Sequence, residues 1–178
     1  MKLPIFPAWF PASALAMAAV GTAHAAEPAD IPVPLQVAPA HKLALEAHAR
    51  GVQIYECKAS KNDATRLEWV FRAPEADLFD TAGNRIGKHY AGPTWEANDG
   101  SSVVGEVKAK ADAPSPDALP WLLLSARSTA GSGIFATIQA IQRAHTTGGK
   151  APATCESAQA GQETRVPYTA DYYFYSAG

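Results

Sequence analysis

Apolar and polar residues alternate along much of the chain after Gly51, and such alternation predicts short β-strands. The clearest case is 166–175, where Val166, Tyr168 and Tyr172 share one side with Ala170 and Phe174. Segments rich in Gly, Pro, Asn and Asp separate the predicted strands, which are 52–58, 66–72, 75–79, 94–97, 102–109, 120–127 and 166–175. The pattern predicts an all-β fold, namely a single-domain sandwich or barrel of short antiparallel strands.

Two segments have a less regular pattern. The segment 134–144 fits helical spacing through Ile134, Ile138 and Ile141, but alternate residues from Ile134 also fit a strand. We predict a strand there because its neighbours are strands. The segment 41–50, HKLALEAHAR, is rich in alanine and leucine, and Gly51 stands where a helix C-cap glycine would. We therefore predict a short N-terminal helix over 41–50.

The N-terminus has the composition of an export signal. Lys2 precedes a mostly apolar run over 3–20, and Ala23-His24-Ala25 supplies the small residues of a cleavage site. An uncleaved membrane anchor is the alternative, but prolines interrupt the run, and no later segment approaches the ~20 apolar residues of a span. We predict a signal peptide at 1–25, a proline-rich arm and short helix at 26–50, and a β domain at 51–178. Such a protein is exported, either periplasmic or secreted, with no transmembrane span after cleavage.

The sequence contains two cysteines, Cys57 and Cys155. In an exported chain an even number predicts a disulfide, and two cysteines allow only one pairing. A pair of buried free thiols is the alternative. No CxxC motif occurs and no histidine is near either cysteine, so we predict no metal site. The formal net charge is −2 without any basic run, so nucleic acid is not an expected partner.

The turn Asn98-Asp99-Gly100 connects the predicted hairpin strands 94–97 and 102–109, and it allows two registers. With a two-residue loop, Trp95 lies opposite Val104 on an exposed face, and Glu96 points inward. With a three-residue loop and a left-handed Gly100, Trp95 moves to the apolar face and Glu96 to solvent. The first register suits a ligand platform and an acid of raised pKa, whereas the second makes Trp95 a core residue.

The chemistry-bearing residues near this turn are His89, Trp95, Glu96 and Asp99, which we take as candidate ligand-binding residues. A histidine with two carboxylates could also perform acid–base catalysis if the three converge in a cleft. The alternative for His89 is a structural hydrogen bond to backbone. Arg143 and Arg165 are candidates to pair with carboxylates in a structural role.

A formal GxGxxA match at 131–136 does not indicate a dinucleotide site. The glycines do not directly follow the strand, and too little chain remains for further βα units. We predict a flexible loop there and no cofactor.

Several phrases, taken in order, resemble domain-of-unknown-function family 3455, which is found in exported bacterial proteins and in fungi. They are GVQIYEC (51–57), WVFRAPEADLFD (69–80), GKHYAGPTWEANDGSSVVGEV (87–107), LPWLLLSARSTAGSGIF (119–135), IQRAHTTGGKAP (141–152) and RVPYTADYYFY (165–175). Both cysteines fall in or beside these phrases. The resemblance implies a single exported domain. It supplies no catalytic residue, and these residues give no support to the malate dehydrogenase label that some fungal relatives carry.

Three functions are consistent with these features. The first is a non-catalytic exported binding or envelope-associated protein, in which Trp95, Trp69 or Trp121 on a rigid β scaffold holds a small molecule or glycan. The second is a hydrolase that uses His89, Glu96 and Asp99. The third is a structural or stress-related exported protein without a specific ligand, which would have neither a pocket nor an aromatic patch.

Overall fold

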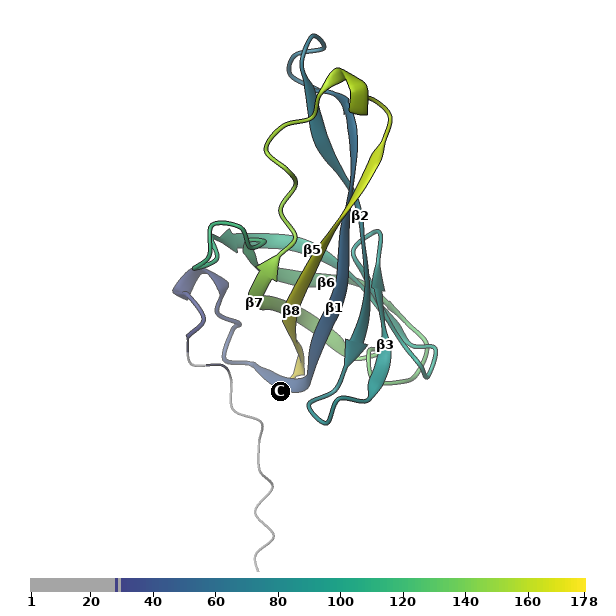
Figure 1. Ribbon diagram of the computed structural model, residues 1–178. Helices are drawn as coiled ribbons and strands as arrows, with labels where there is room; N and C mark the ends of the chain where they lie inside the picture. The colour runs from purple at the N-terminus through teal and green to yellow at the C-terminus, as the bar shows by residue number, and fades with distance from the viewer. Residues whose placement is uncertain (1–27, 29) are drawn as a thin grey trace, which may run out of the picture.

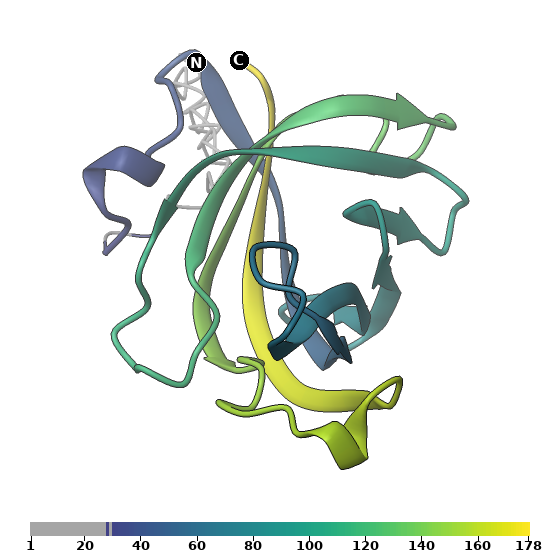
Figure 2. The ribbon, with the colours of Figure 1, turned by 90° about the horizontal axis from the view of Figure 1, so that it is seen from above.

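Eight antiparallel strands form a closed barrel, in which each strand pairs with the next along the chain and β8 pairs with β1 (Figures 1 and 2). This computed structural model describes residues 28 and 30–178, so the predicted signal peptide at 1–25 lies outside the described residues. The strands are β1 (His41–Ala59), β2 (Leu67–Phe79), β3 (Arg85–Tyr90), β4 (Thr94–Ala97), β5 (Ser102–Ala111), β6 (Trp121–Ala130), β7 (Ile138–Gly148) and β8 (Glu163–Ala177). Two 3-10 turns, η1 (Val33–Leu35) and η2 (Ser157–Gln159), are the only helical elements of the described chain. The all-β prediction is confirmed, and the barrel is the form it takes.

The predicted N-terminal helix over 41–50 is wrong, because this segment is the first half of β1. It pairs with β8 on one side, and from His48 onward it also pairs with β2 on the other. Ala47 and Ala49 point into the barrel and are fully buried, so pairing and burial override the helical preference of the sequence. Gly51 caps no helix. A Cβ at this position would collide with the Glu75 carbonyl oxygen of the neighbouring strand.

The other strand predictions hold with changed limits. Segments 66–72 and 75–79 are one continuous strand, β2, and 134–144 becomes the strand β7 only from Ile138. The strand β3 was not predicted. In β8 the predicted alternation is confirmed, since Tyr168, Tyr172 and Phe174 all face the barrel interior.

The up-and-down order of the strands gives the barrel two different ends. At one end lie the β2–β3, β4–β5 and β6–β7 connections, and there Phe135 of the β6–β7 loop inserts fully buried against Phe174, with ring centroids 4.8 Å apart. At the other end the hairpin of β1 and β2 extends beyond the barrel, and the start of β8 accompanies it as far as Glu56 (Figure 1). Figure 2 looks onto that second end. The first end is therefore plugged by aromatic side chains, whereas the second carries the candidate site.

A second apolar cluster lies on the outside of the barrel. Ile31 and Leu35 of the N-terminal segment pack on Trp121, Tyr173 and Tyr175. The segment is held further by Gln142, whose Nε2 donates to the Leu35 carbonyl over 2.7 Å. Residues of the predicted arm thus cover this outer face and shield its aromatic side chains from water.

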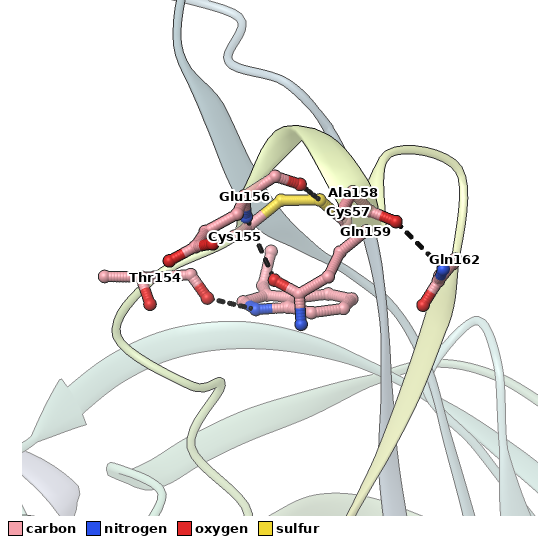
Figure 3. Close-up of a disulfide and its surroundings, with 8 residues drawn as sticks. Cys57, Thr154, Cys155, Glu156, Ala158, Gln159 and Gln162 are labelled. Carbon is pink, nitrogen blue, oxygen red and sulfur yellow. Dashed lines mark hydrogen bonds between the residues drawn. A yellow bond between two sulfur atoms is a disulfide. The ribbon is translucent and has the colours of Figure 1, made fainter.

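The predicted disulfide is present and joins Cys57 of β1 to Cys155, ahead of η2, with 5.8 Å between the Cα atoms (Figure 3). A capping box in which Glu156 and Gln159 bond to each other's backbone orders the turn beside it. Trp69 of β2 donates from Nε1 to the Thr154 carbonyl over 2.7 Å. These contacts tie the long β7–β8 connection to the projecting β1–β2 hairpin.

An ionisable cluster connects the N-terminal segment to the outer wall. Asp171 of β8 accepts from Nδ1 of His48 at 2.6 Å and Nδ1 of His145 at 2.9 Å, and Nε2 of His145 lies 3.0 Å from Asp30. His145 occupies a left-handed backbone conformation, with φ of 48°, at a register shift of β7. Burial by itself lowers the pKa of His145, but the hydrogen bonds that its ring nitrogens donate to Asp171 and Asp30 outweigh burial, and the pKa is raised.

We expect the Cys57→Ser/Cys155→Ser double variant to be less stable than the oxidised protein. The disulfide closes a loop with a sequence separation of 98. Removing such a crosslink lowers the free energy of unfolding by up to about 4.7 kcal/mol in the chain-entropy model. Urea unfolding of the variant and of the oxidised and reduced wild type measures the difference. Equal unfolding free energies for all three would contradict the prediction.

We expect the pair of His145 and Asp30 to stabilise the fold at mildly acidic pH and to lose that effect as the pH rises. Folding raises the pKa of His145 above its ordinary value of 6.5. The resulting stabilisation is fully present below pH 6.5 and is lost as the pH rises through the pKa of the folded state. Asp30→Asn should therefore lower the melting temperature more at about pH 6 than at about pH 9. Asp112→Asn, at an exposed carboxylate outside this cluster, is the control. An equal loss at both pH values would show that protonation of His145 plays no part.

Candidate functional site

The candidate site is a cavity of about 340 Å³ inside the barrel, at the end from which the β1–β2 hairpin projects. Aliphatic and aromatic side chains form most of its wall, and a few polar groups lie among them. The lining residues are Gln53, Tyr55, Phe71, Arg72, Pro74, His89, Gly92, Pro93, Trp95, Val107, Leu119, Leu122, Leu124, Arg143 and Tyr172. A barrel of eight strands has an interior wide enough for side chains or for one small ligand.

Trp95 reaches this cavity because the hairpin adopts the three-residue loop. Gly100 is left-handed with φ of 82°, Trp95 pairs with Val103, and Glu96 pairs with Ser102. Trp95 is consequently on the apolar face and only 1% exposed. Gly105 leaves room for its ring, since a Cβ there would lie 2.9 Å from Cζ3 of Trp95. The register that makes Trp95 an interior residue is therefore the one observed.

His89 stacks directly on Trp95 within the barrel. Their ring centroids are 4.4 Å apart with an angle of 11° between the planes, and the Tyr172 ring makes a T-shaped contact with His89, with 5.3 Å between the centroids. Nδ1 of His89 donates to the Thr94 carbonyl at 2.9 Å, which makes Nε2 an acceptor in the neutral ring. Burial lowers the pKa of His89 to about 3. His89 is thus an uncharged aromatic wall residue at physiological pH.

Glu96 lies on the outer surface of the same hairpin. Its carboxylate pairs with Nζ of Lys88 at 3.1 Å and accepts from the Tyr90 hydroxyl at 2.8 Å. These hydrogen bonds, first that from Tyr90 and then that from Lys88, hold the pKa of Glu96 below its usual value. Glu96 is therefore an ionised surface residue.

Asp99 organises the plugged end of the barrel. Its Oδ1 accepts from the backbone and hydroxyl of Ser101 at 2.8 and 2.6 Å, and its Oδ2 accepts from the Ile134 amide at 2.9 Å. The Ser101 hydroxyl in turn lies 3.1 Å from the Phe135 amide. Asp99 thus fixes the loop that inserts Phe135 into the barrel.

The structure brings His89 and Trp95 together and separates them from the two carboxylates. His89 faces the interior, Glu96 faces outward on the paired strand, and Asp99 is at the opposite end. A hydrolase built on His89, Glu96 and Asp99 required these side chains to converge, and they do not. Trp121 is also buried in the outer cluster, so an exposed tryptophan platform is not found at Trp95 or Trp121.

Sequence reasoning missed the polar groups of the cavity, which come from Gln53, Arg143 and Tyr172 on β1, β7 and β8. Arg143 was expected to pair with a carboxylate. Arg165 does so, with Glu75 at 2.7 Å, but Arg143 makes no ion pair with any described residue. Its Nε and Nη2 donate instead to the Pro120 carbonyl at 3.2 and 2.8 Å. The sequence signal for Arg143 is its position two residues after the inward-facing Ile141, which places a charged side chain on the interior side of the strand.

The opening of the cavity has two exposed apolar side chains. Phe71 is 51% exposed and Val107 is 50% exposed, and both line the cavity. Tyr55 stands between wall and rim, with its ring 5.7 Å from Phe71 and its hydroxyl donating to the Gly149 carbonyl at 2.6 Å. Apolar side chains left in water at the entrance of an apolar cavity are typical of a ligand entrance.

Residues 28 and 30–178 contain neither a metal-binding group nor a membrane-spanning helix. No group of three or more His, Cys, Asp or Glu residues in this part of the chain could hold a metal ion. The same residues include no helix with the length and apolar character needed to cross a membrane.

The chain belongs to the family described as "Protein of unknown function (DUF3455)", which matches residues 38–176. No curated protein and no solved structure matches the chain. The matched range includes both cysteines and all eight strands, apart from Ala177, the last residue of β8.

We expect Asp99→Ala to loosen the plugged end of the barrel, whereas Glu96→Ala should leave it intact. The first substitution removes the acceptor of the Ile134 amide, and the second removes only surface contacts. Amide hydrogen exchange at Ile134 and Phe135 should therefore accelerate in Asp99→Ala alone, and the melting temperature should fall further than in Glu96→Ala. Unchanged exchange in Asp99→Ala would show that the turn does not hold the loop.

Proposed function

We propose that this DUF3455 protein is an exported, non-catalytic binding protein that holds one small, mostly apolar molecule inside its barrel. The observation that carries the proposal is the cavity of about 340 Å³, whose apolar wall continues to the exposed Phe71 and Val107 at its opening. Folding normally removes such side chains from water, so a cavity and an exposed apolar rim together favour a ligand.

The size and composition of the cavity support this proposal. Small-molecule sites usually occupy about 300–1,000 Å³ and combine an apolar wall with a few placed polar groups. The stacked rings of His89 and Trp95, with Tyr172 at their edge, offer flat aromatic surfaces to a ligand. The presence of a pocket also disfavours a purely structural protein without a ligand.

The residues that line the cavity favour binding over hydrolysis. None of those described is a serine, cysteine, aspartate or glutamate, so the wall offers no carboxylate and no activated nucleophile. His89 is held neutral and stacked, with a pKa of about 3, which is far from the value suited to a general base at neutral pH.

Export is supported by the disulfide of Cys57 and Cys155 and by the apolar N-terminal run over 3–20. Structural disulfides persist in oxidising compartments and are rare in the cytosol. A binding protein outside the cytoplasm would meet its ligand in the periplasm or beyond the cell.

The test is binding of octan-1-ol, a neutral probe, to the full chain by isothermal titration calorimetry. Val107→Ser removes an apolar group from the rim, so its affinity for octan-1-ol should fall about three- to tenfold if Val107 is covered by the ligand. Val33→Ser is the matched control, since Val33 is 78% exposed and does not line the cavity. Both valines are exposed, so neither substitution should change the melting temperature much.

An absence of octan-1-ol binding to the wild type would remove the support for a binding function. Equal loss of affinity in Val107→Ser and Val33→Ser would place the binding site somewhere other than the barrel. The emission of Trp95, which lines the cavity, should shift on binding and gives a second readout.

A further inference from the structure

Arg143 is a cation within a largely apolar wall and has no anionic partner among the described residues. Burying a guanidinium away from water is costly unless it is paired and hydrogen-bonded. Arg143 is half-buried, and two of its nitrogens use one carbonyl, that of Pro120. A guanidinium has five N–H donors in a planar fork, so it retains donors for a further acceptor.

Three more donors of the cavity lining lack a hydrogen bond of normal geometry. They are the hydroxyl of Tyr172, Nε2 of Gln53 and Nε1 of Trp95, in side chains that are 1%, 3% and 1% exposed. The Tyr168 hydroxyl lies close to Tyr172 and Gln53, but it forms no hydrogen bond of normal geometry either. The Tyr172 hydroxyl is near Arg143, and burial raises the pKa of Tyr172, so it stays protonated and able to donate. A buried donor without an acceptor destabilises the folded protein, and an acceptor on a ligand would remove that cost.

Arg143 gives this group of polar side chains a net positive charge. The other titratable residues of the lining are His89, which is neutral, Tyr55, and Arg72 at the rim, which pairs with Glu56 at 3.0 Å. With no described carboxylate in the lining, Arg143 leaves the cavity one uncompensated positive charge. An anionic ligand group would neutralise it, whereas a cationic one would be repelled.

We propose that the ligand is a small amphipathic carboxylic acid, whose carboxylate is bound by Arg143, Tyr172 and Gln53 and whose apolar body fills the space beside Trp95 toward Phe71 and Val107. This inference rests on the proposed binding function and adds the class of ligand. A carboxylate matches the planar fork of arginine, and its single negative charge would neutralise the positive charge of Arg143. The small volume of the cavity, about 340 Å³, selects a short-chain or single-ring acid over a long lipid.

The experiment compares three probes with the same apolar chain, octanoate, octan-1-ol and octylamine, by calorimetry on the full chain. Octanoate should bind at least about tenfold more tightly than octan-1-ol, because its carboxylate accepts charge-assisted hydrogen bonds that the hydroxyl of octan-1-ol cannot match. Octylamine should bind more weakly than octan-1-ol. Equal affinity for octanoate and octan-1-ol would overturn the inference and leave the binding function standing, whereas failure of all three probes would defeat both.

Variants then locate the carboxylate. Arg143→Gln should reduce octanoate affinity at least about tenfold with octan-1-ol affinity unchanged, and Arg143→Lys should retain part of it. Arg72→Gln is the matched control, because Arg72 lines the same opening but is already paired with Glu56. An equal loss in Arg72→Gln would place the carboxylate at the rim and overturn the assignment to Arg143.

Tyr172→Phe keeps the ring and removes only the unpartnered hydroxyl, so it is the safer variant if Arg143→Gln fails to fold. It should weaken octanoate binding by about three- to tenfold and leave octan-1-ol binding unchanged. Unfolding curves establish that each variant is folded before binding is measured. An octanoate affinity that is unchanged in both Tyr172→Phe and Arg143→Lys would overturn the inference.

Discussion

Pairing of β1 with β8 is the constraint on which the rest of the structure depends, because it closes the sheet. The two strands pair from His41 with Ala177 to Glu56 with Glu163, along almost the whole length of both. Closure leaves no free sheet edge and divides every strand into an inward and an outward set of side chains. It therefore determines which side chains can meet, and brings Gln53, Arg143 and Tyr172 from three strands onto one wall.

Within this frame the two ends of the barrel are filled differently. At one end Asp99 and Ser101 hold the loop that inserts Phe135 against Phe174, and the interior is densely aromatic. At the other end the wall contains donors that find no acceptor among the described residues, and the cation Arg143, which has no anionic partner among them. Sequences normally satisfy buried polar groups, and sites that break this rule are the places where function is expected.

Much of the fold follows from local pattern. Alternation in 166–175 predicts which side of β8 is buried, because the inward positions there are alanine or aromatic residues. The segment 41–50 defeats the same reasoning, since Ala47 and Ala49 have a helical preference and their burial depends on partners more than 100 residues away in β8. The hairpin around Gly100 allows two registers locally, and only the barrel interior decides between them. Of the candidate site residues, His89 and Trp95 lie in the cavity wall, whereas Glu96 has the solvent position of the three-residue register and Asp99 lies in the turn. The spacing could not reveal that Asp99 also accepts from the amide of Ile134, 35 residues further along the chain.

A cavity and unpartnered donors lower stability, so the fold needs compensation near the same end. The crosslink between Cys57 and Cys155 lies on the strand that also carries Gln53 and Tyr55. The Tyr55 hydroxyl and the Trp69 indole bind backbone carbonyls of the β7–β8 connection, at Gly149 and Thr154. The strongest covalent constraint of the chain and two long-range hydrogen bonds are thus concentrated around the cavity opening. They hold the rim in place without filling the interior, so the folded barrel keeps its cavity.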